Sequence, residues 1–146
     1  MIRTQYAICA ERVVRDANSN TVSIFEVVEE IQSPGFPRLV PMIMAVWVLE
    51  RDAGDPQQPP AALRLIHNGA ELHRTDLTVD FQDVNRTRAF VRLGGLVLPG
   101  PGTLRFSFLL DGEERAFYNI EVRQVGGEGL IVQVVGAPAA PAPPGA

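Results

Sequence analysis

Apolar and polar residues alternate along most of this chain, and Gly, Pro, Asn and Asp interrupt the alternation at short intervals. A period of two is typical of β-strands, because successive side chains of a strand point to opposite faces of its sheet. The stretch 25–31 alone resembles a helix, and its β-branched residues and the Ser-Pro-Gly that follows limit it to a turn or two. The pattern predicts an all-β fold with strands at 4–14, 21–31, 41–51, 62–67, 70–74, 76–82, 86–93, 103–110, 114–123 and 129–135.

Residues 39–49 depart from this alternation, because they are apolar on both faces. Such a run is typical of a strand that is covered on both sides. We expect a central strand here, covered by a second sheet or by a partner. Short strands separated by frequent turns are typical of antiparallel sandwiches and barrels.

The segment 75–93 predicts a hairpin whose turn is Asp83-Val84-Asn85. In this register Asp80 lies opposite Arg88 and Asp76 lies opposite Arg92 on the outer face, while apolar residues meet on the inner face. A shift by one residue would place the Arg side chains in the core.

Two further hairpins follow from the apolar pattern. A three-residue loop at 111–113 pairs three core positions, which are Phe108 with Ala116, Phe106 with Tyr118 and Leu104 with Ile120. A tight turn at Asn68-Gly69 sets Leu65 opposite Leu72 and Arg64 opposite His73. His67 and His73 then lie on opposite faces, so they cannot bind one metal ion.

Composition narrows the chemistry. The 146 residues fit one domain, and the 13 basic residues are all Arg, against 17 acidic residues and a net charge of −4. The absence of Lys excludes a P-loop lysine and a Schiff base, and the acidic balance argues against a general attraction to nucleic acid. One Cys and two His exclude a disulfide framework and the usual zinc sites.

The ends of the chain carry their own signals. The first six residues lack the order of a signal peptide, and the run 39–49 is shorter than the ~20 residues of a membrane-spanning helix. With the lone Cys9, which we expect to be a small buried residue, this predicts a cytoplasmic protein that does not enter membranes. We expect a β-domain over 1–136 and a disordered Ala/Pro-rich tail over 137–146.

Catalytic motifs do not emerge from the sequence. It contains neither Gly-x-Ser-x-Gly nor Gly-x-Gly-x-x-Gly, and its paired carboxylates are adjacent residues that point apart on a strand. Asp80, Asp83 and Asn85 are the best candidates for a cation site, but Asp80 is better used opposite Arg88. We expect no enzyme, no cofactor and no metal; a hydrolase using His67 or His73 is the competing hypothesis.

An outward face with Arg and aromatic residues is the remaining functional signal. Arg and aromatic side chains are favoured at the centres of protein interfaces. We therefore expect a protein-interaction or structural module that binds a partner, or a second copy, through an exposed sheet face or edge, to which the apolar strand 129–135 can contribute. A small-ligand-binding barrel or sandwich is the alternative. The predicted contact residues are Arg86, Phe90, Arg92, Leu109 and Phe117.

The stretch from Leu98 to Phe108, followed by Asp111-Gly112-Glu113, resembles the late hairpin of bacterial immunoglobulin-like sandwiches. The N-terminal half, from Ala7-Ile8-Cys9-Ala10 to Phe36-Pro37, is similar to a family of small, uncharacterised bacterial proteins with such a fold. Together the two stretches span most of residues 5–123. The resemblance implies two antiparallel sheets packed as an immunoglobulin-like sandwich, with no catalytic residue to transfer. Trp47 is present, but a single Cys cannot form the bridge of true immunoglobulin domains.

Overall fold

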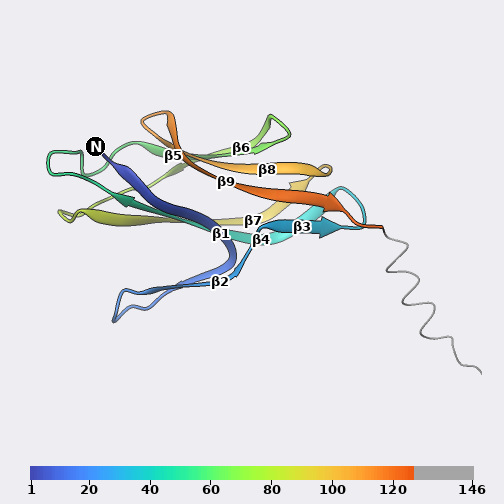
Figure 1. Cartoon of the computed structure of the whole chain (residues 1–146), viewed down its shortest axis with the longest axis horizontal. Helices are drawn as coiled ribbons and strands as arrows, with labels where there is room; N and C mark the ends of the chain where they lie inside the picture. The colour runs from blue at the N-terminus through green and yellow to red at the C-terminus, as the bar shows by residue number, and fades with distance from the viewer. Residues whose placement is uncertain (127–146) are drawn as a thin grey trace, which may run out of the picture.

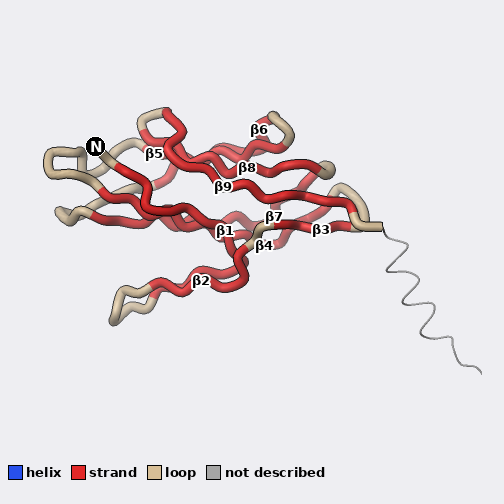
Figure 2. Tube along the Cα trace, in the orientation of Figure 1, coloured by secondary structure: helices blue, strands red, loops and turns tan. Residues whose placement is uncertain are grey.

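The computed structural model describes residues 1–126. Nine strands in this range form two sheets, and the range contains no helix (Figures 1 and 2). Sheet A has the order β2-β1-β4-β7 and is antiparallel throughout. Its strands are β1 (Arg3–Arg15), β2 (Val22–Val27), β4 (Arg38–Glu50) and β7 (Arg86–Leu98). No helix in this part of the chain is long and apolar enough to cross a membrane.

Sheet B has the order β3-β9-β8-β5-β6. Its strands are β3 (Glu30–Ser33), β5 (Ala61–His67), β6 (Ala70–Leu77), β8 (Gly102–Leu110) and β9 (Glu113–Gln124). The neighbours in it are antiparallel except for β3 and β9, which run parallel. The predicted all-β fold with two sheets is confirmed. The predicted strand 129–135 and the tail 137–146 lie outside the described residues.

The main core lies between the two sheets, because alternate residues of each strand face the opposite sheet. Trp47 of β4 packs against Phe108 of β8 with ring centroids 5.4 Å apart, and its indole N–H donates to the Thr4 hydroxyl at 2.9 Å. Burying a side chain of this size contributes about 1.5–3 kcal/mol to stability. The indole therefore adds apolar burial without leaving an unpaired polar atom.

The central position predicted for residues 39–49 is confirmed, since β4 lies between β1 and β7. Its second face is covered by the chain itself. Pairing of β1 with β4 ends at Ala10, and residues 11–27, here called the arm, continue as a hairpin on the side of sheet A away from sheet B (Figure 1). A second apolar cluster joins the arm to this outer face; its members are Ile8, Ala10, Val13, Val22, Ile24, Met44, Val46 and Val48.

The hairpin predicted over 75–93 is wrong. β6 ends at Leu77, residues 78–85 form a loop, and β7 pairs with β4 along its whole length. The long apolar β4 offers β7 a ladder from Arg38 to Glu50, which is longer than the one that 76–82 could supply. The alternation within the loop has another cause: Val79 and Phe81 are buried in the main core. The strand predicted over 21–31 also divides, into β2 and β3.

The predicted Asp80–Arg88 and Asp76–Arg92 cross-strand pairs disappear with that hairpin. Asp80 accepts hydrogen bonds from the Gln82 backbone N–H and the Gln58 side chain instead. Arg88 donates to Asn20 in the arm.

The hairpin between β8 and β9 has the three predicted core pairs, Phe108 with Ala116 among them. Its loop differs from the prediction, because Asp111 and Gly112 alone form the turn, with positive φ angles of 53° and 83°. An irregularity in the ladder makes up the difference: Leu109 pairs with Glu114 and Phe108 with Ala116, so Arg115 is the extra residue.

The turn predicted at Asn68-Gly69 is confirmed, with φ angles of 50° and 83°. A bulge shifts the register beyond it, so Leu65 pairs with His73 and not with Leu72. Leu72 still packs against the main core, and His73 is exposed. In both hairpins the turn has two residues, and a bulge beside it shifts the register so that the apolar residues still face the core.

Candidate functional site

The structure divides the predicted contact residues between two faces. Arg86, Phe90 and Arg92 lie on β7, where Phe90 pairs with Val46 and Arg92 with Met44, on the outer side of sheet A. Phe90 is 42% exposed. These three residues therefore share one surface, as predicted.

Phe117 and Leu109 lie on the other side of the molecule. Phe117 of β9 is 52% exposed and pairs with Ser107 on the outer side of sheet B, and the guanidinium carbon of Arg105 lies 3.8 Å from the centre of its ring. Leu109 is on the same side but only 4% exposed, between Ala62 and Glu114 on the neighbouring strands. The prediction that Leu109 is exposed is wrong. Strand parity determines the face of the sheet on which a side chain lies, but neighbouring side chains determine how much of it is exposed. Phe90 and Phe117 do not form one patch.

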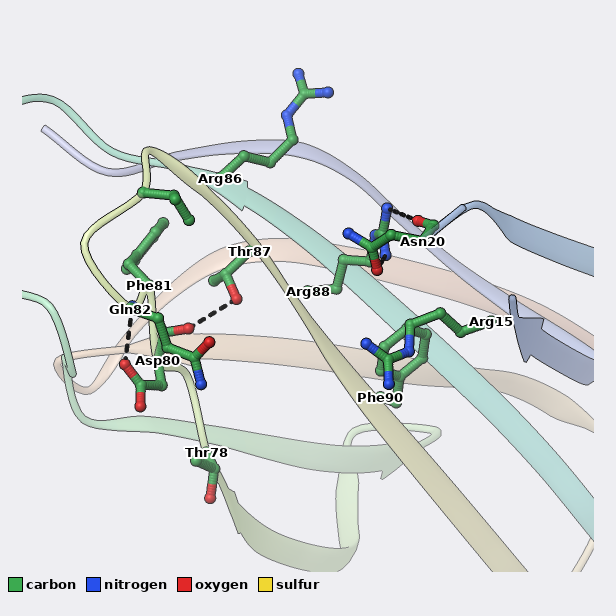
Figure 3. Close-up of a pocket in the computed structure, with 11 residues that line it drawn as sticks. Arg15, Asn20, Thr78, Asp80, Phe81, Gln82, Arg86, Thr87, Arg88 and Phe90 are labelled. Carbon is green, nitrogen blue, oxygen red and sulfur yellow. Dashed lines mark hydrogen bonds between the residues drawn. The ribbon is translucent and has the colours of Figure 1, made fainter. Parts of the chain in front are cut away.

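A hollow of about 490 Å³ lies where the tip of the arm approaches β7 (Figure 3). The arm contributes Arg15 and Asn20, and β7 contributes the stretch from Arg86 to Phe90. The loop after β6 forms the remaining wall. The lining residues are Arg15, Asn20, Thr78, Asp80, Phe81, Gln82, Val84, Arg86, Thr87, Arg88 and Phe90.

Arg88 is held in place by the arm. Its guanidinium donates to the Asn20 carbonyl oxygen at 2.9 Å and to Asn20 Oδ1 at 3.2 Å. Asn20 is at a positive φ of 60°, a conformation that Asn tolerates better than most residues. A guanidinium has five N–H donors, so Arg88 keeps donors for a ligand while its position is fixed.

The hollow is basic. Asp80 is the one carboxylate among its lining residues, and both of its oxygens accept hydrogen bonds from Gln82 and Gln58 at 3.0 and 3.1 Å. Arg86 points away from the other side chains in Figure 3 and pairs with Glu50 at 3.4 Å. Arg15 and Arg88 thus face this space with no carboxylate partner within residues 1–126.

Paired and unpaired Arg side chains both occur on the outer side of sheet B, where the exposed Arg74 forms no ion pair within residues 1–126. Arg64, Arg105 and Arg123 each lie 2.6–2.8 Å from a Glu carboxylate. The outer side of sheet A gathers three unpaired Arg side chains in one place, since Arg15, Arg88 and Arg92 form no ion pair in the described part of the chain. We name the space lined by Arg15, Asn20, Arg88 and Phe90 the basic hollow.

Sequence reasoning missed Arg15 and Asn20, because they lie about 70 residues from β7 in the chain and no local pattern connects them. One signal was available. The run 39–49 is apolar on both faces, which requires a cover for the outer side of sheet A, and the arm carries Val13, Val22 and Ile24 for that purpose. The polar tip between these residues must then come close to β7.

Nucleophiles and bases are placed elsewhere. Cys9 is fully buried, and this burial raises the pKa of its thiol far above the ordinary value. His67 is 5% exposed, and its Nε2 lies 2.9 Å from the carbonyl oxygen of Gly100, to which it donates. Residues 1–126 contain no group of three His, Cys, Asp or Glu side chains that could hold a metal ion.

Comparisons with known proteins support the fold without giving an activity. A model described as a family of unknown function (DUF6941) matches residues 5–123, the range over which the sequence resembles an uncharacterised family. No curated protein matches the sequence.

Many solved structures are similar to this chain, and two of them show the range of the likeness. One is the alkylpurine DNA glycosylase AlkC of Pseudomonas fluorescens, bound to DNA containing an abasic site analog, at 12% identity and a TM-score of 0.55. The match covers 84% of this chain and 30% of the glycosylase, so this chain spans less than a third of that protein. The other is a CARDB domain from Pyrococcus furiosus in complex with di-metal ions, at 8% identity, a TM-score of 0.39 and coverage of 82% and 94%. At 12% identity the likeness to the glycosylase concerns the fold alone.

Proposed function

This chain belongs to the DUF6941 family, a family of unknown function, and from that premise we propose that it is a non-enzymatic interaction module that binds a protein partner at the basic hollow. The observation that carries the proposal is the set of guanidinium groups without carboxylate partners beside the half-exposed Phe90. An aromatic side chain with adjacent Arg donors is typical of the residues that contribute most to protein interfaces.

The charge of the site favours a protein segment with carboxylates. Arg15 and Arg88 can each donate to a carboxylate in a charge-assisted hydrogen bond, and Arg92 lies two positions beyond Phe90 on the same face. A nucleic acid is disfavoured, because its phosphate chain needs a longer basic surface and the chain as a whole has a net charge of −4.

A small-ligand site is the second candidate, favoured by one observation. The volume of about 490 Å³ lies within the range of small-molecule pockets. Arg15, Asn20, Asp80, Gln82 and Arg88 give the walls a polar character, however, whereas such pockets are mostly apolar. A ligand that raises the melting temperature, with the rise lost in Phe90→Asp, would favour this candidate.

Affinity capture from the native lysate tests the proposal, with Phe117→Asp as the matched control. Both Phe90 and Phe117 are half-exposed aromatic residues on the outer face of a sheet, but they lie on opposite sides of the sandwich. We expect a stoichiometric protein partner that Phe90→Asp loses and Phe117→Asp retains. A partner retained by both variants, or no partner at all, would contradict the proposal.

We further propose that the sandwich is immunoglobulin-like and that the protein works in the bacterial cytoplasm. The packing of Trp47 between the two sheets supports the first point. The free thiol of Cys9 supports the second, because lone thiols suit a reducing compartment. A crystal structure and cell fractionation test these two points.

A further inference from the structure

A second surface of this chain is acidic and partly apolar, and its charge is opposite to that of the basic hollow. At the base of the arm, Ala10 pairs with Val27 and Arg12 with Phe25, so Glu11 and Glu26 lie between these pairs at the same level. Phe25 and Val27 are 41% and 44% exposed. We name the surface formed by Glu11, Phe25, Glu26 and Val27 the acidic ridge.

The two carboxylates of the ridge are close enough to disturb each other. Hydrogen bonding to Glu26 and its charge raise the pKa of Glu11 above the ordinary value. The guanidinium of Arg12 stacks over the ring of Phe25 at 4.4 Å, and Arg38 lines the same hollow as both carboxylates. Neither Glu11 nor Glu26 has a salt bridge within residues 1–126. The ridge therefore has two carboxylates without a salt bridge in the described residues, beside exposed apolar side chains.

The ridge is also open to a partner along its edge. β2 is the outermost strand of sheet A and pairs with β1 alone. An edge strand with exposed apolar residues is accessible to a second chain, and a charge on it limits which chain can approach. In this case the charge is negative and selects a basic surface.

We propose that the partner at the basic hollow is a second copy of this chain, which places its acidic ridge there. In this contact Glu11 and Glu26 of one copy face Arg15 and Arg88 of the other, and the apolar side chains of the ridge pack on Phe90. The inference rests on the proposed function, since it names the occupant of the same site. The inference is based on charge complementarity, because within the described range the hollow has guanidinium groups without carboxylate partners and the ridge has carboxylates without salt bridges.

The contact is head-to-tail. A symmetric dimer that joined two hollows would bring Arg15 and Arg88 against the same residues of the other copy, which like-charge repulsion opposes. A single ridge-in-hollow contact leaves one free ridge and one free hollow, which meet in a closed dimer only if the two copies are related by a two-fold rotation. Such an interface gives a closed ring or a growing chain of copies, depending on the rotation between neighbours.

Sedimentation and light scattering over a range of concentrations test the inference. We expect the average mass of the full chain to rise with concentration. The hollow variant Arg15→Gln/Arg88→Gln and the ridge variant Glu11→Gln/Glu26→Gln should each weaken self-association by about tenfold or more. Phe117→Asp is the control that should associate like the unsubstituted protein, and melting curves report whether each variant is folded.

Mixing the two variants gives the sharpest result. The hollow variant keeps an intact ridge and the ridge variant keeps an intact hollow, so a mixture should form one contact and stop at a heterodimer. A general loss of stability in either variant would not restore association on mixing. Restoration at a one-to-one ratio therefore supports the ridge-in-hollow contact specifically.

Two results would overturn the inference. One is a constant monomer mass at all concentrations, and the other is unchanged self-association in both Gln variants. If the protein is monomeric but captures a different partner that Phe90→Asp loses, the proposed function stands and the second copy is excluded. If it is monomeric and captures nothing, both proposals fail.

Discussion

Phe81 stabilises the fold by packing in the main core, and it contributes to the alternating pattern that wrongly predicted a strand over 76–82. It is fully buried in the main core although it lies in the loop 78–85, and its ring lies 5.5 Å from the guanidinium carbon of Arg51. Arg51 in turn donates to the Val84 and Asp55 carbonyl oxygens, so the ring also supports the contacts that hold this loop. The loop is thus anchored by packing and not by a strand ladder.

We expect Phe81→Ala to lower the free energy of unfolding by about 3–5 kcal/mol, because it leaves a cavity in a well-packed core. The matched control is Val84→Ala in the same loop, where Val84 is 54% exposed and the expected change is within about 0.5 kcal/mol. Urea unfolding of both variants measures the difference. Equal costs at the two positions would contradict the anchoring role of Phe81.

At the scale of elements, the arm is attached to sheet A by a small set of contacts. Val13 is 8% exposed in the cluster that joins the arm to Val46 and Val48, while the next residue, Val14, is 45% exposed. The tip is held by the two hydrogen bonds from Arg88 to Asn20. Release of the arm would uncover the outer face of sheet A without opening the main core.

Val13→Asp should release the arm, because a carboxylate in this cluster loses its hydration without gaining a partner. We expect faster amide hydrogen exchange across residues 11–27, with exchange in β5 and β8 unchanged, and a loss of about 2 kcal/mol in stability. Val14→Asp, which stays in solvent, is the control and should leave the exchange of the arm as it was. Faster exchange throughout the chain would show instead that the arm and the sheets unfold together.

The sequence predicted most elements but not how they are joined, and the reason is visible in particular residues. Period two located β1, β4, β5, β8 and β9 within a few residues, because strand alternation is local. Val79 and Phe81 show the same alternation in a loop, so the pattern could not distinguish a strand from a loop packed into the core. The turn at Asn68-Gly69 was recognisable, whereas the loop at 111–113 was predicted one residue too long. The bulges beside both turns depend on which residues the core accepts.

The candidate site was predictable only in part. Arg86, Phe90 and Arg92 share a face because strand parity places them there. Arg15 and Asn20 join them through the path of the arm, which is a tertiary feature with no local signal. Leu109 has the predicted parity, but its burial depends on neighbours in other strands.

Considered as a whole, the molecule separates its charges. The net charge of −4 conceals a basic hollow at the tip of the arm and an acidic ridge at its base. Several remaining carboxylates form ion pairs: Glu30 pairs with Arg123 at 2.8 Å and Glu114 with Arg105 at 2.6 Å. Acidification should therefore change the stability contributed by the ion-paired carboxylates and by the carboxylates of the acidic ridge in opposite directions.

The pH dependence of stability follows from the signs of these pKa shifts. Hydrogen bonds from Arg105 and Ser107 lower the pKa of Glu114, and those from Gln32 and Arg123 lower the pKa of Glu30. The unfolded chain then binds more protons, so the stability these groups provide is present above the ordinary Glu pKa of about 4.3 and is lost as pH falls through their lower folded values. We expect the melting temperature to fall with acid in that window, and less steeply in Glu114→Gln.

Glu11 supplies the opposite sign within the same experiment. Its pKa is raised by Glu26, so the folded protein takes up this proton more readily than the unfolded chain does, and acidification through the raised pKa stabilises the fold. Glu11→Gln removes this gain and should make the melting temperature fall more steeply with acid, whereas Glu114→Gln makes it fall less steeply. Melting curves of the three proteins at matched pH values measure both slopes at protein concentrations low enough to prevent association. If both variants change the slope in the same direction, the two Glu side chains do not have the separate environments that their neighbours indicate.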